Sequence, residues 1–84
     1  MRARNINGKL NIIGPNLMKY RKEKELSLRE LADKLALKGI TMYHSDIYSI
    51  EHQNRTIKDF ELKAICQVLN ITYEQLFENT EEIE

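Results

Sequence analysis

The fold is decided by the stretch Ser27-Leu28-Arg29-Glu30-Leu31-Ala32-Asp33-Lys34-Leu35 and, after a glycine-bearing connector, by Ser45-Asp46-Ile47-Tyr48-Ser49-Ile50-Glu51. Ser27 and Glu30 have the spacing of a capping box, in which each side chain binds the other residue's backbone NH at the start of a helix. The apolar residues that follow fall on one side of that helix: Leu28, Leu31, Ala32 and Leu35. Two short helices joined by a turn are typical of a helix-turn-helix, so the sequence predicts that motif here.

The second helix of the motif has an inward and an outward side. Ile47 and Ile50 are three residues apart and face inward, which leaves on the outward side His44, Ser45, Tyr48, Ser49 and His52. In a helix-turn-helix that binds DNA, residues in these positions meet the groove.

Length and composition indicate one small helical domain. Eighty-four residues allow a single modest core, and one Pro with three Gly favours an all-α class. The sequence has no signal peptide and no apolar run approaching the ~20 residues of a membrane span, so we expect a cytoplasmic protein without a membrane partner. The lone Cys66 has no internal disulfide partner, and its apolar neighbours predict that it is buried.

The charge of the chain is divided between its two halves. Residues 1–38 hold ten Lys or Arg against four Asp or Glu, a net charge of +6, whereas residues 39–84 hold three against nine, a net charge of −6. A basic half can meet phosphate while the acidic half faces elsewhere. The alternative is that both halves are ordinary solvated surfaces.

A set of spaced residues extends the pattern beyond the two helices. It consists of Arg21, the Leu31-Ala32 pair with Leu35, Ile47-x-x-Ile50-Glu51, Asp59-Phe60-Glu61-Leu62-x-x-Ile65 and Leu69-x-Ile71-x-x-x-x-Leu76-Phe77. In order and spacing this set resembles the phage-repressor-like (Xre/Cro-type) helix-turn-helix family over residues 13–77. The connector through residues 37–42 resembles a lengthened-turn variant of that family. The resemblance implies a compact five-helix, lambda-repressor-like domain in which Arg21 and Glu51 form a structural ion pair. The alternative for Arg21 is an exposed charge.

Three segments are expected along the chain. Residues 1–12 lack helical periodicity and predict a flexible N-terminal arm. The alternatives for this arm are a short strand paired elsewhere, or a segment that follows DNA with Arg2, Arg4 and Lys9. The helix-turn-helix domain covers residues 13–78 and begins with a helix near Pro15, whose missing NH costs nothing in a first turn. Residues 79–84 form an acidic C-terminal tail.

Further helix boundaries follow from local signals. We expect helices over about 28–37, 44–52 and 59–69, the last ended by Asn70 and followed by a short helix with a Thr72–Gln75 capping box. The inward residues of the 59–69 helix are Leu62, Ile65, Cys66 and Leu69. The family's left-handed glycine after the 44–52 helix is replaced by Gln53, followed by Asn54, so we expect the cap either to move by one residue or to cost some stability.

The resemblance implies a sequence-specific, DNA-binding transcriptional regulator, and we expect a repressor that binds double-stranded DNA as a homodimer. Base contacts would come from His44, Ser45 and Ser49, and backbone contacts from Ser27, Arg29, Tyr48, Arg55 and Lys58. Candidate dimer contacts are Tyr73 and Phe77, although Phe77 is expected to complete the core beside Leu76.

Two residues depart from the family pattern. Leu28 stands where the family commonly has a phosphate-contacting Gln, and Asp46 places a negative charge at the front of the reading helix. Asp46 can accept a hydrogen bond from cytosine N4 or serve as an N-terminal acid of its own helix. These departures favour the alternative function, a helix-turn-helix scaffold that acts as an accessory or antitoxin-like protein-interaction module.

The search for catalytic chemistry is negative. The sequence contains no Gly-rich phosphate loop, no HExxH and no CxxC, so we expect no enzyme and no cofactor. His44 and His52 are eight residues apart, about 12 Å along a helix, which is too far to share one metal ion. No residue pattern in the sequence identifies a small-molecule effector.

Overall fold

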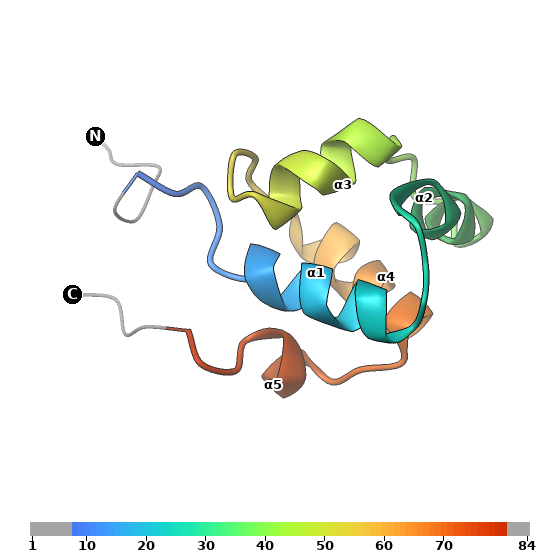
Figure 1. The fold of residues 1–84 in the computed structure, drawn as a ribbon. Coiled ribbons are helices and arrows are strands. Elements are labelled where there is room, and N and C mark those ends of the chain that lie inside the picture. Colours follow the sequence, from blue (N-terminus) through green and yellow to red (C-terminus); the bar gives the residue numbers. More distant parts are fainter. Residues whose placement is uncertain (1–7, 81–84) are drawn as a thin grey trace.

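The computed structural model describes residues 8–80, and within them the chain forms five helices and no strand. The helices are α1 (Gly14–Glu23), α2 (Leu28–Leu37), α3 (His44–Glu51), α4 (Asp59–Leu69) and α5 (Tyr73–Leu76). In Figure 1, α3 runs along the top of the molecule and α5 lies at the bottom, on the opposite side of α1. The predicted all-α class with five helices is confirmed. The expectations for residues 1–7 of the arm and 81–84 of the tail lie outside the described residues.

The predicted capping boxes begin α2 and α5. The Ser27 hydroxyl accepts from the Glu30 NH at 3.0 Å, and the Glu30 carboxylate accepts from the Ser27 NH at 2.8 Å. That backbone hydrogen bond is the main reason why the pKa of Glu30 is lowered. Thr72 and Gln75 repeat the arrangement at α5, with distances of 3.0 and 2.9 Å. Both helix starts are therefore set by residues three apart in the sequence.

The ends of the helices use left-handed residues. Asn70 follows α4 with φ 55°, as predicted. After α3, Gln53 itself adopts φ 64°, and the Asn54 NH donates to the Ser49 carbonyl at 2.8 Å. The expected shift of the cap by one residue is therefore wrong. The Gln53 side chain donates to the Asn11 carbonyl at 3.0 Å, which helps to hold this backbone conformation.

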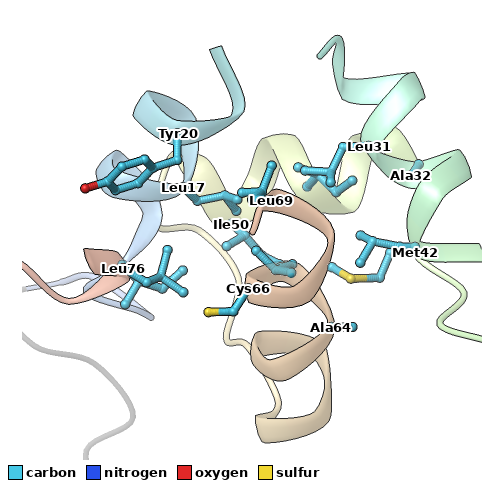
Figure 2. Packing of buried hydrophobic residues seen from close by; sticks show 14 residues of the cluster. Leu17, Tyr20, Leu31, Ala32, Met42, Ile50, Ala64, Cys66, Leu69 and Leu76 are labelled. Atoms are coloured by element: carbon cyan, nitrogen blue, oxygen red, sulfur yellow. The ribbon is translucent and has the colours of Figure 1, made fainter. Parts of the chain in front are cut away.

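One hydrophobic core is enclosed by the helices. Figure 2 shows core side chains from α1 to α5 converging between the ribbons, together with Met42 from the connector. Because Met42 is 4% exposed, the lengthened turn contributes to the core. Cys66 is buried as predicted, and this burial raises the pKa of its thiol.

The C-terminal part of the core differs from the prediction. Leu76 is fully buried, whereas Phe77 is 39% exposed, so the expectation that Phe77 completes the core is wrong. Adjacent residues of a helix point about 100° apart, and here Leu76 takes the inward position while Phe77, which follows as the cap of α5, points toward solvent. In α4, Leu62 is only partly buried, while Glu61 is 4% exposed.

The described part of the arm is docked on the domain. The Leu10 NH donates to the Gln53 carbonyl at 3.0 Å. Asn11 accepts from the Gly14 NH at 2.8 Å, and its amide donates to the carbonyls of Ile50 at 2.9 Å and Arg55 at 2.8 Å. Leu10 and Asn11, which belong to the arm predicted over residues 1–12, are therefore hydrogen-bonded to the domain. The sequence analysis did not predict this docking, because the residues that Asn11 binds lie 39 and 44 positions further along the chain.

Close backbone packing joins the start of α1 to the end of α3. A Cβ atom at Gly14 would meet the carbonyl oxygens of Ile50 and Glu51 well inside van der Waals contact. Glycine is therefore required here to let the two helices approach. None of the helices in residues 8–80 has the length and apolar run that crossing a bilayer requires.

Candidate nucleic-acid interface

The inner side of α3 is fixed by a buried ion pair. The Arg21 Nε and Nη2 atoms donate to the two carboxylate oxygens of Glu51 at 2.5 and 3.0 Å, and Nη1 donates to the Leu26 carbonyl at 2.8 Å. Arg21 is 8% exposed and Glu51 3%. The structure therefore contains the pair that the family resemblance implied, and the alternative of an exposed Arg21 is wrong. This pair links the end of α3 to α1.

The outer side of α3 is polar and open to solvent. Ile47 and Ile50 are fully buried, while the exposed residues are His44, Ser45, Tyr48 and His52, with Ser49 half-buried. The Tyr48 and His52 rings stack with their centroids 4.1 Å apart. The structure thus brings the three predicted base-contacting residues, His44, Ser45 and Ser49, to one helix and leaves them accessible to a ligand.

Asp46 and Arg55 connect the start of α3 to the loop that follows it. One Asp46 oxygen accepts from the Tyr43 NH at 2.9 Å, and the other lies 3.9 Å from Arg55 Nε. Asp46 therefore serves as an N-terminal acid of α3, one of the two roles considered for it. Because each Asp46 oxygen already has a partner, the carboxylate is less available to accept a hydrogen bond from a base.

Arg55 is committed to a carboxylate that the sequence did not single out as its partner. Its Nη1 and Nη2 atoms donate to the two oxygens of buried Glu61, each at 3.1 Å. Burial raises the pKa of Glu61, but hydrogen bonds from Arg55 and from the Lys58 NH outweigh it, so the pKa is lowered overall. Glu61 raises the pKa of Arg55 in turn. Arg55 was predicted to contact phosphate, but two of its guanidinium nitrogens already donate to Glu61. It therefore has fewer NH groups left for a phosphate.

The other predicted backbone-contacting residues are exposed. Ser27 and Arg29 lie at the N-terminus of α2, where backbone NH groups attract anions. Lys58 precedes α4, and its ammonium lies 5.8 Å from the centre of the Phe60 ring. Leu28 is half-buried and packs against the core. Its side chain therefore contributes to folding.

The sequence prediction missed two exposed residues beside α3. Tyr43, the residue before the helix, is 68% exposed, and Leu37, in the last turn of α2, is 89% exposed. Tyr43 breaks the apolar pattern just ahead of the outward face of α3, which is a signal that could have identified it. Tyr43 therefore extends the accessible surface at the start of α3.

A second accessible surface lies between α4 and α5. A groove of about 440 Å³ is lined by Asp59, Phe60, Leu62, Lys63 and Tyr73. Phe60 is 53% exposed and Tyr73 49%, so the predicted dimer contact Tyr73 is available to a partner. Phe77 is also exposed. Dimerisation through these rings remains a prediction.

Within residues 8–80 no three His, Cys, Asp or Glu side chains come together in a way that could hold a metal ion. No protein-family model matches the chain, and a comparison with curated proteins also gave no match. What the chain binds therefore has to be inferred from its own residues and geometry.

Proposed function

We propose that the chain is a transcriptional repressor that binds specific sequences in double-stranded DNA. We propose also that its helices have the lambda-repressor-like helix-turn-helix arrangement. In this proposal α3 enters the major groove as one half of a symmetric dimer. The observation that carries the proposal is the contrast between the two sides of α3. Its inner side is buried, with Ile47 and Ile50 in the core and Glu51 paired with Arg21, and its outer side presents only polar or aromatic groups to solvent.

The way in which α3 is held supports a recognition role. An isolated helix of eight residues is unstable in water. Here it is fixed at its start through Asp46 and at its end through the Arg21–Glu51 pair and Asn11. An α-helix with its side chains is about 10–12 Å wide, which matches the ~12 Å width of the major groove. A rigid helix with free polar side chains is suited to reading base edges.

The proposal assigns distinct roles to the surrounding side chains. His44, Ser45 and Ser49 contact base edges, because imidazole and hydroxyl groups can donate to or accept from them. Phosphate contacts come from the N-terminus of α2 and from the side chains of Ser27, Arg29, Tyr48, Lys58 and, to a lesser extent, Arg55. The exposed rings of Tyr73 and Phe77 supply dimer contacts.

A protein-interaction module is the second candidate function, and three observations favour it. The helix α3 contains neither Lys nor Arg, and Arg55 is paired with Glu61 and Asp46. The groove beside Phe60 and Tyr73 offers an apolar surface to a protein partner. This candidate predicts a folded chain that does not bind DNA at low salt.

The test is a fluorescence-anisotropy titration of the purified chain with duplex fragments from upstream of its own gene. At ~50 mM salt we expect specific binding, and at ~200 mM salt binding that is weaker by orders of magnitude, because phosphate contacts release counterions. Changing His44, Ser45 and Ser49 together to Ala should abolish specificity. The matched control changes to Ala three exposed residues outside α3 that have no proposed contact, namely Lys22, Gln67 and Glu74.

The outcomes separate the candidates. Binding lost only in the α3 triple variant supports groove reading. Salt-sensitive binding that survives this triple variant contradicts the proposed base contacts. Absence of binding at low salt, with a helical circular-dichroism spectrum, refutes DNA binding and favours the protein-interaction module.

A further inference from the structure

Both histidines of the protein lie on the outward side of α3. His44 is the first residue of the helix and His52 caps its end, with Tyr48 one turn from each. Both imidazoles are exposed. Because α3 contains neither Lys nor Arg, any positive charge that this surface itself presents to a ligand has to come from the two imidazoles.

The structure indicates which nitrogen of His52 takes up a proton. Its Nδ1 lies 2.9 Å from the Tyr48 carbonyl oxygen. A carbonyl oxygen can only accept, so Nδ1 carries the hydrogen of the neutral ring and Nε2 holds the lone pair. Protonation at Nε2 converts His52 to an imidazolium ion while the bond to Tyr48 stays in place. The stacked Tyr48 ring further restricts the imidazole.

No carboxylate in the described residues is paired with either histidine. The ion pairs there are formed by Lys19, Arg21 and Arg55. On α3 itself, Asp46 lies beside Arg55 and Glu51 binds Arg21. The other charged or titratable groups on α1, α2 and the segments that flank α3 are Lys19, Tyr20, Lys22, Glu23, Lys24, Glu25, Arg29, Glu30, Asp33, Lys34, Lys38, Tyr43 and Lys58. An approaching anion is therefore the first strong partner that the imidazoles meet.

We propose that α3 binds DNA with the uptake of protons by His44 and His52, so that binding strengthens as the pH falls. This inference rests on the proposed function. Phosphate oxygens and the guanine O6 and N7 atoms are acceptors that stabilise an imidazolium ion more than a neutral imidazole. Histidine is the side chain whose charge ordinarily changes between about pH 5 and pH 8, so the coupling acts in that range.

The test is an anisotropy titration of the full chain with one duplex at about pH 5.5, 6.5, 7.5 and 8.5, at constant ionic strength. If bound DNA favours the proton on each imidazole about tenfold, the dissociation constant falls about tenfold per histidine between the alkaline and acid ends. Because the proposed dimer carries two copies of each histidine, His44→Gln and His52→Gln should each remove about two tenfold steps. The double variant should bind with little pH dependence.

A second readout counts the new charges. Each imidazolium ion that lies at a phosphate makes the slope of log K against log salt steeper by about one between pH 8.5 and pH 5.5. The change is therefore at most about four for the two histidines on each half of the dimer. This change should disappear in the double Gln variant. The double variant His44→Lys/His52→Lys carries permanent charges, and it should bind at every pH with the salt slope that the unchanged protein shows at acid pH.

Lys22→Gln is the matched control, because it removes one positive charge from an exposed position on α1 that has no proposed contact with DNA or with a second copy, and it leaves α3 unchanged. It should keep the full pH dependence. Binding that is equally strong at all four pH values, or a pH dependence that survives in the double Gln variant, overturns the proton-uptake inference and leaves the proposed function intact. Absence of binding to any duplex at all four pH values refutes the proposed function itself. Circular dichroism at each pH verifies that every variant is folded.

Discussion

Breaking the Arg21–Glu51 pair should destabilise the protein by an amount that depends on which partner is removed. In Arg21→Met, Glu51 keeps a side chain that is 1% exposed and loses both of its hydrogen-bond donors. An unpaired buried charge of this kind costs about 3–5 kcal/mol. In Glu51→Gln, Arg21 keeps the Leu26 carbonyl and an amide oxygen, so we expect a loss of about 2 kcal/mol.

The double variant Arg21→Met/Glu51→Met makes the reasoning testable even if Arg21→Met does not fold. It removes both charges, and apolar replacements of buried ion pairs are often close to neutral, so we expect it to lie within about 2 kcal/mol of the unchanged protein. Arg21→Met alone should therefore be less stable than the double variant. Lys22→Met is the matched control, since Lys22 is the exposed neighbour in α1 and should change the stability by less than about 0.5 kcal/mol.

The assay is urea unfolding followed by circular dichroism, with thermal unfolding as a second measurement. For a domain of this size each kcal/mol corresponds to about 4–8 °C in Tm. If Arg21→Met is no less stable than Lys22→Met, or if the double variant is less stable than Arg21→Met, the pair does not act as a mutually dependent buried unit. Either result would refute the argument from burial.

Three further predictions concern positions that the tertiary structure singles out. Asn11→Ala removes three hydrogen bonds and should lower the free energy of unfolding, measured in urea, by about 2–3 kcal/mol. Asn54→Ala is the control, because its side chain is exposed and the change should have little effect. Equal losses in the two variants would contradict the docking of the arm. Glu25 is exposed and has a left-handed backbone with φ 58°, which glycine adopts more readily than other residues. Glu25→Gly should therefore raise Tm by a few degrees, and a lower Tm would show that the substitution relieves no backbone strain. The Tyr20 hydroxyl donates to Glu78 and holds the pKa of that carboxylate below its usual value. The stability that this lowered pKa provides is present above the unfolded-state pKa and is lost as the pH falls through the folded-state pKa. Glu78→Gln should therefore flatten the fall of Tm below about pH 5, and an unchanged profile would exclude this contribution.

The sequence by itself determined the secondary structure of the described residues and much of the core. The Ser27–Glu30 and Thr72–Gln75 boxes, the apolar stripe of α2 and the stop at Asn70 were all predicted. These signals succeed because a helix start, stop or stripe depends on residues no more than about four apart, and those neighbours are visible in the sequence. The Arg21–Glu51 pair, 30 residues apart, was predicted only through the family resemblance.

Only the tertiary structure decided how the charged and exposed groups are used. It paired Arg55 with Glu61, placed Asn11 against the end of α3, kept the left-handed cap at Gln53 and turned Phe77 toward solvent. The docking of Asn11 depends on elements distant in the chain. Phe77 points outward because Leu76, about 100° away around the helix axis, takes the inward position. Arg55 and Glu61 are close in sequence, yet their pairing requires the α3–α4 loop to fold back onto the start of α4. Local periodicity carries no information about such packing, because it is set by the summed burial of all five helices.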